Sequence, residues 1–96
     1  MLEGVPDVLR PLLPEVYEAL REILSQACGA VEAGDAAGAR AAAHQLKGAA
    51  MRFSLEALAQ KASQAEECAG SGDLSWTGAA LREFTALLSL LERTGP

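Results

Sequence analysis

The residues most able to take part in chemistry surround the only histidine of the chain, His44. A neutral imidazole is a good nucleophile near pH 7, and a bulky phosphorylated partner could reach an exposed ring. On a helix, Lys47 would lie about one turn from His44 and could place its ammonium beside a transferred phosphoryl group. Gly48 follows directly and would leave the ring uncovered. A lone histidine in a helical protein is more often a solvated surface residue, but this combination favours a nucleophile.

A glycine at position 48 needs a physical reason, because it costs the middle of a helix roughly 1 kcal/mol relative to alanine. Access of a partner to His44 supplies such a reason. Local departures from helix-forming preference are expected at functional sites. We therefore predict that Gly48 serves access to the imidazole.

The segment 36–53, which carries His44, has the apolar spacing of an amphipathic helix. Its core-facing residues fall within about 80° of one another on a helical projection: Ala39, Ala43, Leu46, Ala50 and Phe53. His44 lies about 140° from the centre of this stripe. We therefore expect its ring to point to solvent.

Small and apolar side chains dominate the predicted outer face around His44. With the neighbouring alanines, Met51 would form a smooth apolar patch, which suits the docking of a protein rather than of a small molecule. We predict that the following residues contact this partner: Ala37, Arg40, Ala41, Gln45 and Met51.

Glu66 occupies an unusual position for a carboxylate, about 50° from the centre of the inward face of the next helix. One interpretation is a boundary residue that reaches water or an ion-pair partner. The other is a hydrogen bond to the Nδ1 side of His44, which would fix the tautomer and leave Nε2 free to react.

Four amphipathic segments with short connections predict an all-α fold, an up-down-up-down antiparallel four-helix bundle over residues 14–93. Residues 1–13 are expected to form an N-terminal cap segment, whose short helix lies across one end of the core. Residues 94–96 are expected to be a frayed tail. The whole chain, 1–96, is thus interpreted as one domain.

Capping residues mark the expected helix boundaries. Pro14 suits the first position of the first long helix, which Gly34 ends, and Asp35 caps the second. Ser54 is expected to cap the third helix, and either Asp73 or Ser75 the fourth.

Composition excludes several classes of function. The net charge is -5 and no basic stripe exists, which argues against nucleic-acid binding, and no apolar run is long enough to span a membrane. One histidine with Cys28 and Cys68 far away provides no metal or haem site. No glycine-rich phosphate loop is present, so we expect no ATP site. Without a signal peptide, we expect a cytoplasmic protein with reduced thiols.

The run His44-Gln45-Leu46-Lys47-Gly48 resembles the signature of histidine-containing phosphotransfer (HPt) domains, roughly H-x-L-K-G-[SA]-[SA]-x-x-[FLI]-G-x-x-x-L. In that family an acidic residue follows near the end of the next helix. The further matching positions here are Ala49, Ala50, Phe53, Leu58 and Glu66. The resemblance covers essentially the whole chain. It departs at Ser54, where the family has a glycine that shapes the tight turn between two helices.

The resemblance implies a phosphoryl carrier of a multistep phosphorelay, rather than an enzyme. His44 Nε2 would accept a phosphoryl group from the aspartate of a receiver domain and pass it to another receiver. Lys47 would offset charge on the phosphoryl oxygens, and Mg²⁺ would belong to the receiver. The implied partners are response-regulator receiver domains and a hybrid histidine kinase, and we expect a monomer.

Two alternatives stay open. The first is a helical module that docks on receiver or kinase domains without accepting phosphate. The second is the dimeric phosphoacceptor domain of a histidine kinase, which usually has Glu or Asp directly after its histidine. Gln45 occupies that position here, and the chain has no ATP-binding domain.

Overall fold

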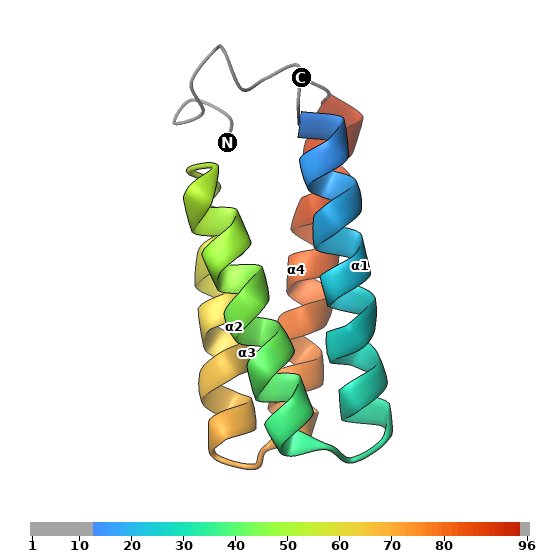
Figure 1. The fold of residues 1–96 in the computed structure, drawn as a ribbon, viewed down its shortest axis with the longest axis vertical. Helices are drawn as coiled ribbons and strands as arrows, with labels where there is room; N and C mark the ends of the chain where they lie inside the picture. Colours follow the sequence, from blue (N-terminus) through green and yellow to red (C-terminus); the bar gives the residue numbers. More distant parts are fainter. Residues whose placement is uncertain (1–12, 95–96) are drawn as a thin grey trace.

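The computed structural model describes residues 13–94, and this part of the chain is all-helical, with no strand (Figure 1). Its four helices are α1 (Leu13–Glu32), α2 (Ala36–Arg52), α3 (Glu56–Gly70) and α4 (Leu74–Thr94). In Figure 1 successive helices run in opposite directions, and α2 and α3 lie on the other side of the bundle from α1 and α4. The all-helical prediction is confirmed.

The predicted bundle of residues 14–93 needs small corrections at both ends. Leu13, the first described residue, already belongs to α1, and α4 includes Thr94. The rest of the predicted N-terminal helix, residues 7–12, lies outside the described residues, as does the end of the predicted tail, residues 95–96.

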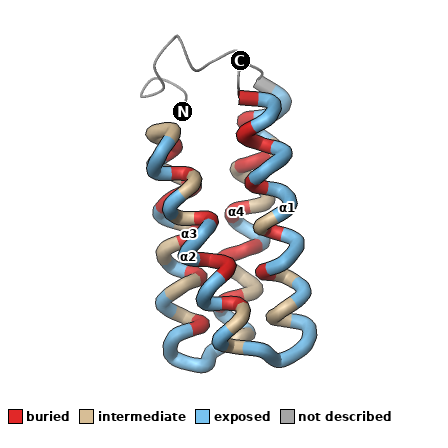
Figure 2. Tube along the Cα trace, in the orientation of Figure 1, coloured by how far each residue is buried: buried red, intermediate tan, exposed pale blue. Residues whose placement is uncertain are grey.

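The core lies where the apolar faces of the four helices meet (Figure 2). Its large, fully buried apolar side chains are Leu13, Leu20, Leu46, Leu58, Leu81, Phe84 and Leu88. On α2, Ala42 is buried although it is not on the predicted stripe, and Phe53, which was predicted to face the core, is only partly buried. The apolar stripes are thus wider than a strict a/d pattern, as is usual for globular helices.

Alanine dominates the buried faces of α2 and α3, which pack against each other. The buried alanines of the two helices are Ala39, Ala42, Ala43, Ala50, Ala59, Ala62, Ala65 and Ala69. Such small side chains allow neighbouring helices to pack closely. This close packing matters for function, because it brings polar groups at the edge of α3 within reach of the outer face of α2.

Two aspartates begin helices as expected. Asp35 caps α2, where its Oδ1 accepts a hydrogen bond from the backbone N–H of Gly38 at 2.9 Å. Asp73 precedes α4, and its Oδ1 accepts from the backbone N–H of Trp76 at 3.1 Å. Asp73 is therefore the cap of α4, and the alternative, Ser75, lies inside the helix.

The prediction that Ser54 caps α3 is wrong. Ser54 has a φ of 58°, and the residue at the cap position is Leu55. The chain reverses between α2 and α3 through a short turn, which the backbone N–H of Leu55 closes on the carbonyl of Ala50 at 2.9 Å. This turn needs a left-handed backbone at position 54, a conformation that glycine adopts without steric cost.

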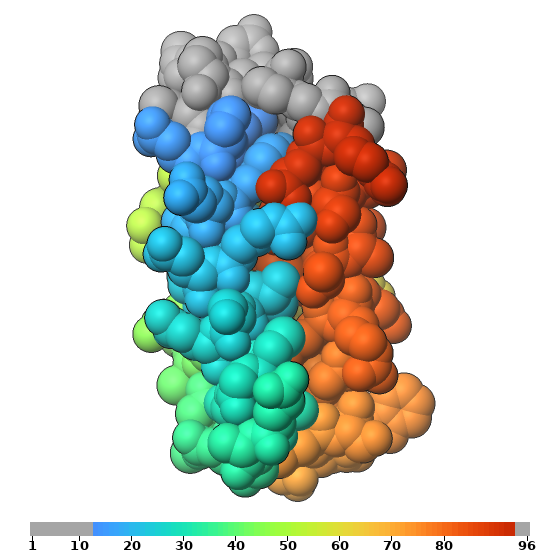
Figure 3. All heavy atoms as spheres, turned by 90° about the vertical axis from the view of Figure 1, so that its right-hand side faces the viewer, coloured from blue at the N-terminus to red at the C-terminus, as the bar shows by residue number. Residues whose placement is uncertain are grey.

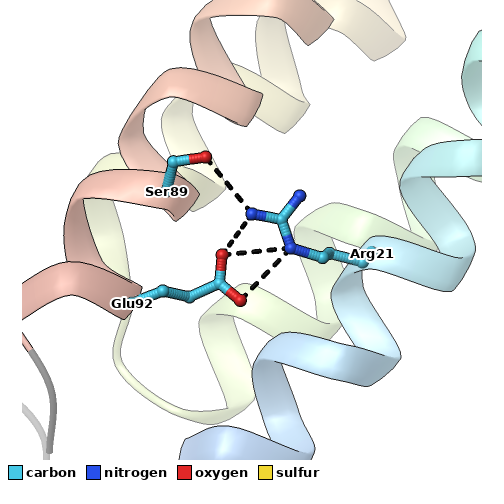
Figure 4. A network of polar contacts seen from close by, with 3 residues as sticks. All are labelled: Arg21, Ser89 and Glu92. Carbon is cyan, nitrogen blue, oxygen red and sulfur yellow. Dashed lines mark hydrogen bonds and ion pairs between the residues drawn. The ribbon is translucent and has the colours of Figure 1, made fainter.

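Helices α1 and α4 pack against each other along the face shown in Figure 3. A polar network crosses this contact near the end of α4 (Figure 4). The guanidinium of Arg21 donates to the carboxylate of Glu92 and, through Nη2, to the hydroxyl of Ser89 at 3.2 Å.

Candidate functional site

Helix α2 holds His44 on its outer face, as predicted. The buried residues of α2 occupy the opposite side of the helix, and the side chain of His44 is 67% exposed. The imidazole is therefore open to a macromolecule approaching from solvent.

The carboxylate of Glu66 reaches the histidine from the neighbouring helix α3. Its Oε2 lies 2.9 Å from Nδ1 of His44, and its side chain is 18% exposed. Of the two interpretations of Glu66, the contact with Nδ1 is thus present, and it coexists with an ion pair to a second residue.

That second residue is Lys47, whose Nζ lies 2.7 Å from Oε1 of Glu66. The hydrogen bond from Lys47, reinforced by the one from His44, lowers the pKa of the Glu66 carboxyl below its ordinary value, although burial opposes this. Glu66 is therefore ionised near neutral pH. One carboxylate holds both polar side chains of α2 that the sequence singled out.

The contact with Glu66 also defines which ring nitrogen of His44 is free. An ionised carboxylate only accepts hydrogen bonds, so Nδ1 is the donor of this pair and carries the hydrogen. In the neutral ring, the remaining lone pair then lies on Nε2. Nε2 has no hydrogen-bond partner among the described residues. The site thus presents Nε2 as an exposed nucleophilic nitrogen, on a ring whose opposite edge is held by Glu66.

Gly48 has open space where a side chain would be. A Cβ built at this position would meet no atom within 4 Å. Gly38, on the same helix, differs, because a Cβ there would clash with the carboxylate of the capping Asp35. Packing therefore explains the glycine at position 38 and does not explain the one at position 48.

All the outer-face residues that the sequence predicted as partner contacts are exposed: Ala37, Arg40, Ala41, Gln45 and Met51. Most of them line a shallow depression beside the ring, which Ala37, Arg40, Ala41, Gln45, His44 and Glu66 form together. Met51 is 63% exposed, one helical turn beyond Lys47. These five residues are thus on the surface of α2, and their contact with a partner stays a prediction.

A groove between α1 and α2, on the other side of the ring, was not predicted from the sequence. His44 and Gln45 lie along this groove together with Val16, Ala19, Ile23, Ala49, Phe53, Glu15, Gly48 and Arg52. On a helical projection Arg52 lies more than about 60° from His44, and the projection of one helix does not show how α1 packs against it. The one sequence feature that could have indicated a role for Arg52 is that α2 contains no acidic residue.

Two further classes of site find no support in residues 13–94. This part of the chain contains no group of three or more His, Cys, Asp or Glu side chains placed to hold a metal ion. None of its helices combines the length and apolar character needed to cross a bilayer.

Comparison with known families assigns the chain to a class. The model of the Hpt domain family matches residues 11–94, so the chain belongs to this family. Hpt domains are phosphocarrier modules of two-component phosphorelays, in which they interact with receiver domains and histidine kinases. No curated protein and no solved structure gives a significant match.

Proposed function

We propose that this chain is a histidine phosphotransfer protein of a multistep phosphorelay. His44 would accept a phosphoryl group on Nε2 from the aspartate of one receiver domain and pass it to the aspartate of another. The observation that carries this proposal is the contact between Glu66 and Nδ1 on a ring that is otherwise exposed.

The step itself needs no acid or base from this chain. The lone pair of Nε2 attacks the phosphorus of the aspartyl phosphate, an N–P bond forms, and the P–O bond breaks with its electron pair left on the aspartate. The hydrogen on Nδ1 stays in place. The phosphorylated ring then carries a positive charge beside the carboxylate of Glu66, and transfer to the second receiver reverses these changes.

Lys47 and Glu66 have complementary roles in this mechanism. Glu66 is a positioning residue, because it fixes the tautomer and stabilises the positive ring. Lys47 lies about one turn from His44 and can offset charge on the phosphoryl oxygens. Charge stabilisation and positioning dominate phosphoryl transfer, so these two groups would make the phosphorylated state accessible.

The partners supply the remaining chemistry. Mg²⁺ would belong to the receiver domains. A hybrid histidine kinase would introduce the phosphoryl group, because we expect no ATP site in this chain. Gly48 and the exposed alanines around His44 would let the receiver approach the ring. We further propose that the protein acts as a monomer in the cytoplasm.

Labelling of His44 tests this proposal against the docking-module alternative. Incubation with a phosphorylated receiver and Mg²⁺ should add one phosphoryl group that is labile in acid and stable in alkali. The variant His44→Gln should lose the label and keep both its helicity and its receiver binding, because the side chain does not contact the core. A docking module would bind receivers without ever becoming labelled, and label that persists in His44→Gln would exclude His44 as the acceptor.

A further inference from the structure

Helix α2 is a basic element in an acidic protein. It contains Arg40, Lys47 and Arg52 and no acidic residue, whereas the chain as a whole has a net charge of -5. The excess of negative charge therefore lies outside the helix that carries His44. A partner that docks on α2 therefore meets basic side chains of this helix on a molecule that is acidic as a whole.

Two of these three basic groups have no ion-pair partner among residues 13–94. Lys47 is already paired with Glu66, but Arg40 and Arg52 are exposed and form no ion pair with any described residue. By contrast, Arg21 and Lys61 elsewhere on the described surface pair with Glu92 and Glu83. Arg40 and Arg52 are therefore the two guanidinium groups of α2 that lack a described ion-pair partner and lie beside the site.

The two arginines lie on opposite sides of His44. Arg40 is one turn before it and extends toward the end of α3, where its Nε lies 3.5 Å from the position of a Cβ on Gly70. Arg52 is about two turns after His44 and lines the groove toward α1. At 1.5 Å per residue, the two positions are about 18 Å apart along the helix axis.

Among residues 13–94, no carboxylate forms an ion pair with either arginine. Glu15 lines the groove beside Arg52, and Glu66 and Glu67 line the depression beside Arg40, yet none of them forms an ion pair with either guanidinium. Glu66 is already engaged by Lys47 and His44. The guanidinium groups therefore keep their hydrogen-bond donors available.

We infer that Arg40 and Arg52 form a two-point clamp that selects receiver domains by acidic side chains at both ends of their docking surface. The apolar strip of Ala41, Gly48 and Met51 would accept the docked element between the two points, and the clamp would set its orientation over His44. Arginine suits this role because its planar fork binds carboxylates in a bidentate manner. This inference rests on the proposed phosphorelay function.

Charge reversal tests the clamp. The test uses the phosphorylated receiver that transfers fastest to the wild-type protein. In the variants Arg40→Glu and Arg52→Glu, the second-order rate constant of this transfer should fall about tenfold at low salt. The deficit should shrink to about twofold at high salt, since screening weakens interactions between exposed charges. The neutral variants Arg40→Gln and Arg52→Gln should show smaller losses in the same direction. Thermal unfolding of each variant checks that the bundle is intact.

Arg82→Glu is the matched control. Arg82 is exposed and unpaired among the described residues, but it lies on α4 and lines neither depression beside His44. Its reversal changes the net charge by the same amount and should leave the rate within about twofold of wild type. Equal rates in Arg40→Glu, Arg52→Glu and Arg82→Glu would overturn the clamp while phosphotransfer itself stands. A wild-type protein that no receiver labels would contradict the proposed function, and this inference with it.

Discussion

Two glutamates each join neighbouring helices of the bundle, but they leave their partner groups in different states. Glu92 of α4 binds the guanidinium of Arg21 on α1, which also donates to Ser89 (Figure 4). Glu66 of α3 divides its two oxygens between Nδ1 of His44 and Nζ of Lys47 on α2. The first network contains no imidazole and joins α1 to α4, whereas the second leaves Nε2 of the imidazole open to solvent.

This difference separates a structural contact from a candidate reactive one. The side chains of Arg21 and Glu92 are 42% and 33% exposed, and exposed ion pairs contribute at most about 1 kcal/mol to stability. Glu66 is less exposed, and one of its partners is the candidate reactive residue His44. The importance of this network therefore concerns the chemistry of His44 as well as the stability of the fold. The same type of bridge therefore connects α1 to α4 and, between α2 and α3, holds one edge of an exposed imidazole.

Covering the exposed side of His44 should have the largest effect on phosphoryl transfer. We predict that Gly48→Leu stabilises the fold by up to about 1 kcal/mol, because leucine is the better helix former and the position is unobstructed. Phosphoryl transfer should nevertheless slow about a hundredfold, the scale expected when reacting groups are displaced by about 1 Å. Thermal unfolding and timed transfer from a phosphorylated receiver measure the two quantities.

Gly29→Leu is the control for this experiment. Gly29 is an exposed glycine of α1 that also has no atom within 4 Å of a built Cβ, and it does not line the groove beside His44. It should gain similar stability and transfer normally. If Gly48→Leu transferred as fast as Gly29→Leu, the access argument would be lost.

Removing charge from each glutamate should distinguish the two networks. In Glu66→Gln an amide oxygen can still accept from Nδ1, but the charge that stabilises the phosphorylated ring is gone. We expect transfer to slow about tenfold, which corresponds to roughly 1.4 kcal/mol and the low end of a charge-assisted hydrogen bond. Glu92→Gln should change stability by at most about 1 kcal/mol and leave transfer unchanged. Equal transfer rates in the two variants would mean that Glu66 is only a structural residue.

Lys47 should show a smaller effect of the same kind. Lys47→Ala should slow transfer about fivefold through the loss of one positive charge near the phosphoryl oxygens, and cost no more than about 0.5 kcal/mol of stability. Lys61→Ala is a close match, since Lys61 pairs with Glu83 and both lysine side chains are 29% exposed. A drop in melting temperature with unchanged transfer in Lys47→Ala would show that this lysine is structural.

The smallest effect on transfer is expected at the turn above the site. Ser54→Gly should raise the free energy of unfolding by about 1 kcal/mol, because it relieves a left-handed backbone at φ 58°. Transfer should not change. Ser71→Gly, at a φ of -86°, relieves no strain and should lower stability. Calorimetry on both variants would reveal an error in the turn geometry if Ser54→Gly melted below wild type.

Apolar periodicity was sufficient to predict the helices and most of the core. Leu20, Leu46 and Leu81 are buried because they fall on stripes that a single helix already defines. Ser54 was misassigned because serine favours capping in general, whereas the direction in which the chain leaves α2 decides its backbone conformation. Turn geometry of this kind depends on the packing of both helices.

The candidate site was predictable to the extent that it lies on one helix. The exposure of His44 follows from its angle on α2. The choice between the two interpretations of Glu66 depends on the register of α3 against α2, which the packed alanines determine. Arg52 and the groove toward α1 were missed because they require the positions of two helices at once.

The most direct test of the account is to identify the nitrogen of His44 that carries the phosphoryl group. Because His44 is the only histidine, a protein labelled with [¹⁵N]histidine gives a single imidazole in long-range ¹H–¹⁵N spectra. After phosphorylation by a receiver, we predict the phosphoryl group on Nε2 and the hydrogen on Nδ1. In the unphosphorylated protein, Glu66→Gln should weaken the preference for the tautomer with its hydrogen on Nδ1. A phosphoryl group on Nδ1 would contradict the account. So would an unmodified imidazole in a protein that has been phosphorylated.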